Sequence, residues 1–207
     1  MNDNTTRRDF FGGAARVAVG GAAAAALGGA AVGLSSPDHL AALSAAPPAG
    51  PQVSPEARLQ ELGIELAPAT APVATYVPTV AVGNVLYVAG HTPRMPDGSA
   101  RYRGKVGDDF TLEEGREAAE YVGTRILATV RANLGSLNRV VRLVRTFGMV
   151  NATPDFTEQP QVINGFSDLM VQVFGEEAGK GTRAAVGMGS LPGGMAVEIE
   201  TFWEIRP

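Results

Sequence analysis

The residues best suited to chemistry are an arginine and a glutamate near the end of the 207-residue chain. Arg183 lies at the start of a predicted strand, between the small residues Thr182 and Ala184. A guanidinium held there can bind a carboxylate through two parallel hydrogen bonds, a geometry that lysine cannot reproduce. Glu198 lies inside an otherwise apolar run, which we expect to form the neighbouring strand. This pattern predicts either a binding site for a small carboxylate or a structural ion pair between the two residues.

The composition excludes several other kinds of site. The chain contains no cysteine, which removes disulfides, thiol catalysis and Cys-ligated metal sites. Its two histidines, His39 and His91, are too few for a His-rich metal site, so we expect neither a metal nor another cofactor. The net charge of −4 argues against nucleic acid as a partner.

Three arginines follow one another closely at positions 139, 142 and 145. On a strand, however, Arg142 would point to the opposite face from Arg139 and Arg145. We therefore interpret this cluster as solvated surface rather than as a binding patch.

Strand and helix patterns alternate along the body of the chain. Their order, ββαβαββ, predicts an α+β two-layer sandwich in which two helices cover one face of a mixed sheet. The predicted strands are Thr75–Val82, Val85–Gly90, Val140–Val150, Arg183–Met188 and Ala196–Ile205, and the predicted helices span residues 111–134 and about 161–174, the second closed by Gly175.

The longest helix has clear signals at both ends. Thr111 and Glu114 have the spacing of a capping box, and Gly135 marks the end of the helix. Its apolar residues recur at steps of three and four, and they leave Arg125 and Arg131 largely off the apolar face.

The first 46 residues differ from the rest. The paired arginines of Thr6-Arg7-Arg8-Asp9-Phe10-Phe11 precede the uncharged run Val17–Leu34, and the small residues Ala41–Ala46 follow. This pattern resembles a twin-arginine (Tat) export signal, which predicts a periplasmic or secreted protein with no membrane attachment after signal removal. The alternative is an uncleaved N-terminal membrane anchor.

A linker over residues 47–72 separates this signal from the main domain, residues 73–207. The linker begins with a Pro-rich stretch and contains a short helix that starts at Ser54-Pro55-Glu56 and ends at Gly63. Ser54 is the expected cap of this helix.

Short motifs in the C-terminal half resemble those of the Rid family, the reactive intermediate deaminases, also called YjgF-like or "endoribonuclease L-PSP" proteins. They are Gly181-Thr182-Arg183-Ala184-Ala185-Val186, Leu191-Pro192 and Val197-Glu198-Ile199-Glu200. Further segments match in the same order: Tyr76-Val77 with Gly83-Asn84, the strand that ends at Gly90, and Val162-Ile163-Asn164. The resemblance covers about residues 72–205.

The resemblance implies a chorismate-mutase-like fold and a homotrimer with a site in each cleft between subunits. It implies hydrolytic deamination of small 2-imino or enamine carboxylic acids to 2-keto acid and ammonia. Arg183 would then bind the substrate carboxylate and Glu198 would orient or activate water. Tyr76, Gly90 and His91 would line the cleft, and Asn164 would lie at the mouth of the neighbouring subunit's site.

The chain departs from the family pattern at three positions. Ala89 stands where many deaminases have serine, Ala185 stands where cysteine is frequent, and His91 replaces a common glutamine. A lost hydroxyl removes one hydrogen bond to substrate, about 0.5–1.5 kcal/mol. A non-catalytic trimeric module that binds small carboxylates is therefore the alternative function. Ribonuclease activity comes third, since it would need convergent acid–base groups around a phosphate-binding surface.

Overall fold

The computed structural model describes residues 53–69, 71–72, 74–97, 99 and 101–206. The predicted export signal, residues 1–46, and the first part of the linker lie outside the described residues. Within the described ranges, no helix has both the length and the apolar character needed to cross a membrane.

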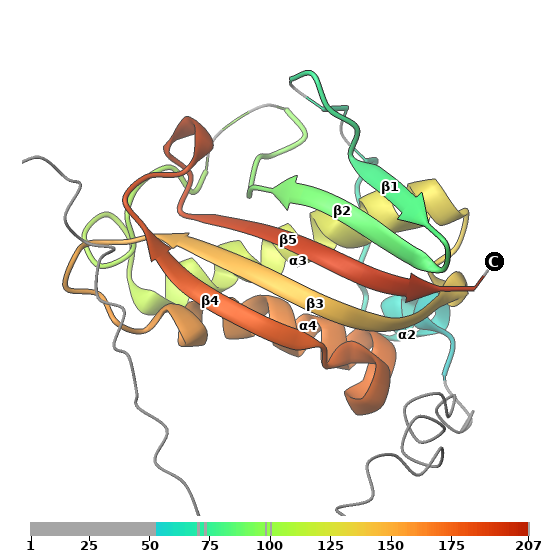
Figure 1. The fold of residues 1–207 in the computed structure, drawn as a ribbon. Coiled ribbons are helices and arrows are strands. Elements are labelled where there is room, and N and C mark those ends of the chain that lie inside the picture. Colours follow the sequence, from blue (N-terminus) through green and yellow to red (C-terminus); the bar gives the residue numbers. More distant parts are fainter. Residues whose placement is uncertain (1–52, 70, 73, 98, 100, 207) are drawn as a thin grey trace, which may run out of the picture. The chain divides into compact units, whose positions relative to one another are not determined.

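A five-stranded mixed sheet forms one layer of the fold (Figure 1). Its strands lie in the order β1-β2-β5-β3-β4, so the last strand of the chain is central. β3 and β4 run parallel, and the other neighbouring pairs of this sheet are antiparallel. In chain order the strands are β1 (Thr79–Val82), β2 (Val85–His91), β3 (Val140–Asn151), β4 (Thr182–Met188) and β5 (Val197–Ile205).

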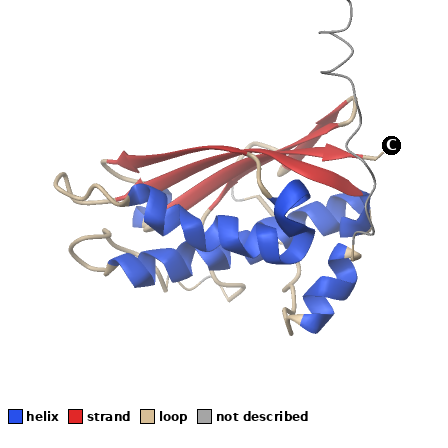
Figure 2. Ribbon diagram, turned by 90° about the horizontal axis from the view of Figure 1, so that it is seen from below, coloured by secondary structure: helices blue, strands red, loops and turns tan. Residues whose placement is uncertain are grey.

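Two long helices cover one face of this sheet (Figure 2). They pack against each other and against the strands, which confirms the predicted α+β two-layer sandwich. The helices are α2 (Pro55–Glu61), α3 (Leu112–Leu134) and α4 (Gln159–Gly179), with 3₁₀ turns η1 (Leu137–Arg139) and η2 (Pro192–Gly194).

α3 has the ends that the sequence predicts. The Thr111 hydroxyl accepts from the Glu114 backbone N–H at 3.3 Å, and the Glu114 carboxylate accepts from the Thr111 N–H at 2.8 Å. Gly135 ends the helix with φ of 80°, a left-handed conformation that favours glycine. The capping box and the glycine stop are therefore confirmed.

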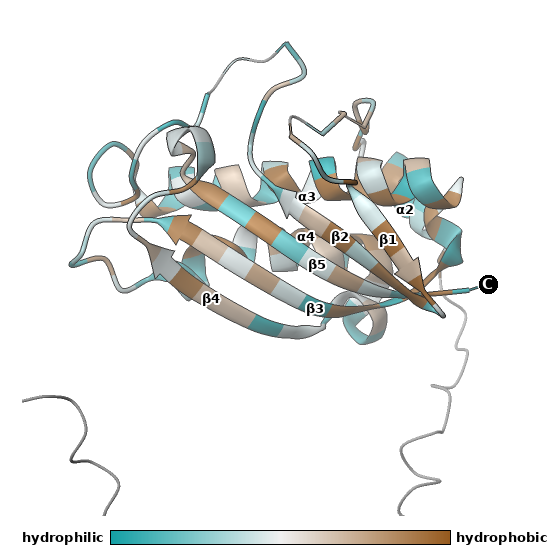
Figure 3. Cartoon of the chain, turned by 45° about the horizontal axis from the view of Figure 1, so that its top comes forward, coloured by the Kyte–Doolittle hydropathy of each residue, from teal (hydrophilic) through white to brown (hydrophobic). Residues whose placement is uncertain are grey.

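β5 supplies the centre of the core, because buried and partly exposed residues alternate strictly along it. Its odd-numbered residues, including Ile199 and Trp203, are buried against the helices, whereas the even-numbered ones are partly exposed on the other face. The alternation is visible as bands of opposite hydropathy along the strand (Figure 3). The indole N–H of Trp203 donates to the Thr201 hydroxyl at 2.8 Å, so this buried donor is satisfied.

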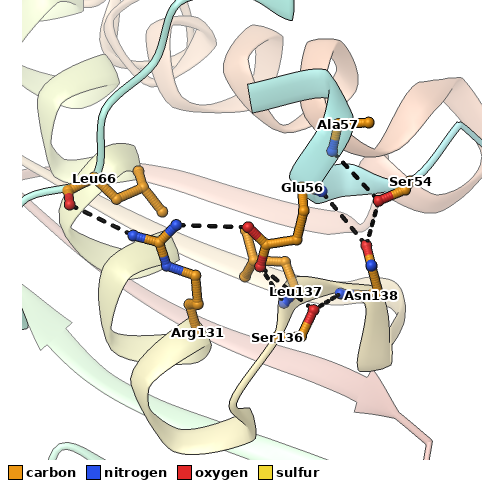
Figure 4. A network of polar contacts seen from close by, with 8 residues as sticks. All are labelled: Ser54, Glu56, Ala57, Leu66, Arg131, Ser136, Leu137 and Asn138. Carbon is orange, nitrogen blue, oxygen red and sulfur yellow. Dashed lines mark hydrogen bonds and ion pairs between the residues drawn. The ribbon is translucent and has the colours of Figure 1, made fainter. Parts of the chain in front are cut away.

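α2 is attached to the turn after α3 by Glu56 (Figure 4). Its carboxylate accepts from the Leu137 backbone N–H at 2.9 Å and from the Ser136 hydroxyl at 3.4 Å, and it forms an ion pair with Arg131 at 3.5 Å. Leu59 of the same helix is buried in the core. The linker helix is therefore part of the folded body.

Residues 66–69, 71–72 and 74–78, which we call the strap, follow α2, and two of their carbonyls accept hydrogen bonds from α3. Arg131 donates to the Leu66 carbonyl at 3.5 Å, and Arg125 donates to the Pro68 carbonyl at 3.0 Å. The helical pattern predicts that Arg125 lies off the apolar face, yet the residue is only 4% exposed. The prediction missed this burial because the strap covers that side of the helix.

At the level of elements, one expectation holds and one needs correction. The backbone of Gly175 is non-helical, with φ of 82° and ψ of 169°, so the regular part of the second long helix closes there as predicted, and a further helical turn follows to Gly179. The first strand begins at Thr79 rather than Thr75, after Pro78, which lacks a donor for the ladder.

Arg142 and Arg145 also differ from expectation. On β3, Arg142 is paired with Glu204 of β5, and Arg145 is paired with Phe202 of β5. Residues paired in this way share a face of the sheet, so both arginines lie on the face away from the helices. The register shifts by one residue between them, at Val144, and this bulge reverses the alternation. The prediction that Arg142 and Arg145 point to opposite faces is therefore wrong.

Candidate functional site

Glu198 lies on the face of the sheet away from the helices, because its neighbours on β5, Val197 and Ile199, are buried in the core. There it lines a cavity of about 580 Å³ together with Tyr76, Gly90 and His91. Four of the predicted site residues are thus brought together. We call this space the Glu198 cavity.

A β-bulge in β2 shapes the Glu198 cavity. Val88 pairs with Thr201 and His91 pairs with Ile199, so β2 contains one extra residue over this stretch. The extra residue turns His91 toward the helices. It also leaves Gly90 directly beneath the Glu198 carboxylate, where a Cβ atom would clash with Glu198 Oε1.

The surroundings of Glu198 favour its protonated form. Burial raises the pKa of the Glu198 carboxyl, and the charge of Glu200 on the same face of β5 raises it further. A carboxyl shifted in this direction can exchange a proton nearer to neutral pH than an exposed glutamate can. The position therefore suits a residue that moves a proton to or from water.

His91 is held as a neutral ring. Its Nδ1 lies 2.7 Å from the Ala89 carbonyl, which can only accept, so Nδ1 carries the hydrogen. Nε2 lies 2.8 Å from the Thr129 hydroxyl and accepts from it. Burial lowers the pKa of His91, and the nearby Arg125 charge acts in the same direction. Both ring nitrogens are thus bonded within the chain, and His91 borders the Glu198 cavity without offering it a free donor.

Arg183 belongs to a different cavity. Its side chain points toward α4, where Nη1 donates to Asn164 Oδ1 at 2.8 Å and to Ser167 Oγ at 3.0 Å. These three residues line a cavity of about 290 Å³, with Thr146 and Lys180 nearby. The ion pairs found among the described residues do not include Arg183. The guanidinium is positioned by two neutral acceptors, and its Nε and Nη2 groups have no hydrogen-bond partner among the described residues.

Ser167 is a hydrogen-bond partner of Arg183 that sequence reasoning missed. It follows Asn164 by three residues, so both side chains lie on one face of α4. That spacing beside a predicted strand arginine was the available signal.

Arg183 and Glu198 do not pair within the chain. In the strand register, Arg183 of β4 is paired with Thr146 of β3, and Glu198 of β5 is paired with Met149 of β3. β3 therefore separates β4 from β5. Arg183 and Glu198 also lie on opposite faces of the sheet. The expectation of neighbouring strands is wrong, because β4 pairs in parallel at the sheet edge while β5 returns between β2 and β3.

Metal ligands are not gathered in the described part of the chain. No group of three or more His, Asp or Glu side chains there is placed to hold a metal ion.

The fold is that of a known class of protein. Residues 56–197 match the family described as "YjgF/chorismate_mutase-like, putative endoribonuclease". The chain therefore belongs to the YjgF/chorismate-mutase-like family.

Individual relatives share most of the domain. Protein TCP17 of Trypanosoma cruzi is 43% identical over 150 residues, which cover 72% of this chain and 93% of that protein. The structure of Atu1372 from Agrobacterium tumefaciens, a protein described as of unknown function, is 43% identical with a TM-score of 0.67 and covers 73% of this chain and 92% of its own. A Shewanella oneidensis protein described as a candidate endoribonuclease is 30% identical with a TM-score of 0.70, covering 74% of this chain and 100% of its own.

Proposed function

We propose that the chain is a Rid-type hydrolytic deaminase of small 2-imino or enamine carboxylic acids. Water adds to the C=N carbon of the iminium form, the C–N bond breaks, and the two protons of water leave with nitrogen. The products are a 2-keto acid and ammonium, and no oxidant or reductant is consumed. The supporting observation is that Arg183, a group suited to bind a carboxylate, and Glu198, a group suited to exchange a proton, each line a cavity of the chain. We call these two cavities half-sites.

The two half-sites would meet between subunits of a homotrimer. Arg183 lies on the edge strand β4, so its free N–H groups can face a neighbouring subunit. Large apolar side chains are exposed on the sheet face away from the helices, among them Val80, Tyr87 and Val144. An exposed apolar face of this kind is typical of a protein interface. We therefore place Arg183 of one subunit at the Glu198 cavity of the next.

Positioning would supply most of the acceleration. An imine hydrolyses unaided, so a bound carboxylate and a correctly placed water are sufficient for useful catalysis. Glu198 in its ionised form would accept a proton from the attacking water, and its raised pKa brings that exchange closer to neutral pH. Tyr76 and Gly90 would form the wall beside the reacting carbon.

Two features favour the alternative, a trimeric module that binds small carboxylates without turnover. Ala89 and Ala185 lack the polar groups frequent among deaminases, and both nitrogens of His91 are engaged within the chain. Such a module would use Arg183 alone, and its ligand would be a stable 2-keto acid.

Export through the Tat pathway is the proposed location, based on Arg7-Arg8 and the uncharged run that follows. Periplasmic material should have a mass lower by the first 46 or so residues. Recovery of full-length protein only in membranes would favour the anchor.

A coupled assay tests the enzyme. An amino-acid oxidase generates the imino acid in situ, and semicarbazone formation reports the imine that escapes hydrolysis. Wild type should lower semicarbazone formation, and Arg183→Ala and Glu198→Gln should each lose most of that effect. Arg101→Ala removes an equally charged, exposed side chain outside both cavities and should behave as wild type. Equal semicarbazone formation with wild type and without protein would overturn the deaminase proposal. Calorimetric binding of 2-keto acids would then test the alternative, the carboxylate-binding module.

A further inference from the structure

Arg125 is a buried arginine that the proposed reaction does not use. It lies on α3 with 4% of its surface exposed. Arginine is rarely buried to this extent without a partner, because removing its charge from water is costly. Its burial therefore calls for a compensating group.

The described part of the chain supplies only part of that compensation. Arg125 Nη2 donates to the Pro68 carbonyl at 3.0 Å, but Nη1 has no hydrogen-bond partner among the described residues. The ion pairs found among the described residues include no carboxylate beside Arg125. A buried cation is left with an unused donor and no counter-charge, which an anionic ligand would provide.

Arg125 also lines the Glu198 cavity. A second arginine, Arg94, lines the same cavity and is exposed at its surface. Glu198 and Glu200 lie on the wall formed by β5. The cavity thus combines acidic groups, suited to an iminium nitrogen, with arginines suited to an acid group. Its volume of about 580 Å³ is that of a small-molecule site.

We infer that Arg125 binds a second carboxylate of the substrate, so that the preferred substrate is a 2-imino dicarboxylic acid. This inference rests on the proposed function, in which Arg183 of a neighbouring subunit binds the carboxylate next to the C=N carbon. The distal carboxylate then extends into the Glu198 cavity and accepts from Arg125. Nη1 is covered in this structure, so we expect the described strap residue that Arg125 contacts, Pro68, to adjust when the ligand binds.

The first test compares two substrates that differ by one carboxylate. 2-Iminoglutarate and 2-iminobutyrate are generated in situ from glutamate and 2-aminobutyrate, and hydrolysis is measured above each uncatalysed rate. Wild-type kcat/KM should be about tenfold to hundredfold higher for the dicarboxylate, the effect of one charged hydrogen-bonded pair. An equal or lower value would overturn the inference while the deaminase activity stands.

The second test uses matched variants of α3. Arg125→Met should remove the preference for 2-iminoglutarate and change 2-iminobutyrate hydrolysis much less, whereas Arg183→Met should impair both substrates. Arg131→Met is the control, because Arg131 also donates to a strap carbonyl but does not line the cavity. An equal loss of preference in Arg131→Met would assign the effect to the strap and overturn the inference. If Arg125→Met does not fold, the substrate preference is measured in Arg125→Lys instead, and the comparison of the two substrates in wild type still tests the inference.

Calorimetry separates this inference from the proposed function. If wild type hydrolyses no imine, the proposed deaminase function is wrong. Even then, 2-oxoglutarate should bind about tenfold more tightly than 2-oxobutyrate. Arg125→Met should abolish that difference. Equal binding of the two keto acids by wild type, or an unchanged difference in Arg125→Met, would show that Arg125 is structural.

Discussion

Gly90 shows how a single backbone position shapes the Glu198 cavity. The β2 bulge brings its Cα under the Glu198 carboxylate, and any side chain there would push that carboxylate away. Gly90 carries no left-handed φ, so alanine fits the backbone itself without strain. Glycine is therefore needed at position 90 to leave space for the Glu198 carboxylate, and not to allow an unusual backbone conformation.

Gly90→Ala should lower kcat/KM for imine hydrolysis by about tenfold to hundredfold, because a displaced carboxylate no longer orients water. The thermal midpoint should change little, since Glu198 is flexible enough to move aside. Gly189→Ala is the matched control, because a Cβ there meets no atom within 4 Å. In a Glu198→Ala background, Gly90→Ala should have no additional effect on rate or midpoint, and a further loss there would place the cause elsewhere.

The lowered pKa of His91 predicts how the stability of the fold depends on pH. Its pKa in the folded chain lies below the ordinary value of 6.5, because burial disfavours the charged ring. The stability that it contributes is therefore fully present above pH 6.5 and is lost as pH falls through the lowered pKa. The free energy of urea unfolding should decrease over that window, and less so in His91→Gln. An imidazole NMR signal of His91 that titrates at or above 6.5 would contradict this.

At the scale of elements, α2 and the strap are held to α3 by a few polar contacts. Glu56 satisfies the backbone N–H of Leu137 and pairs with Arg131, and Arg131 in turn donates to Leu66 in the strap. Since the strap forms one wall of the Glu198 cavity, these contacts link the linker helix to the site.

Glu56→Ala should lower the free energy of unfolding by about 1–2 kcal/mol, because it leaves the Leu137 N–H without its acceptor. Glu61→Ala removes a carboxylate from the same helix that pairs only with the exposed Arg58, and it should stay within about 0.5 kcal/mol of wild type. Urea unfolding of the three proteins measures both values. Equal losses for the two variants would mean that Glu56 does not attach α2 to the turn.

The sequence predicted those elements that depend on local signals. The capping box at Thr111, the stop at Gly135 and the alternation of β5 each follow from residues a few positions apart. The neighbours of β4, the bulges and the burial of Arg125 depend on contacts between distant segments, which local patterns do not encode. For the same reason the sequence named Arg183, Glu198, Tyr76, Gly90 and Asn164 as site residues without showing that they divide between two cavities.

At the scale of the whole molecule, this division of the site is the main consequence of the topology. Because β3 lies between β4 and β5, one chain cannot bring Arg183 and Glu198 to the same ligand. A carboxylate bound at Arg183 can meet Glu198 only on another copy of the chain. The proposed activity is therefore a property of the assembly, and dilution to monomers should abolish it.

Subunit mixing tests this arrangement directly. Arg183→Ala and Glu198→Gln chains should each be inactive alone, since every site in either assembly lacks one group. Co-expressed with different tags and purified through both, the mixed assemblies should recover about a third of wild-type activity, because every mixed cyclic trimer has one site of three that combines an intact Arg183 with an intact Glu198 from its neighbour. Purification through both tags and the semicarbazone assay measure the recovery. Mixed assemblies that remain as inactive as the single variants would show that each chain builds its site alone and would overturn the arrangement inferred from the strand order of the sheet.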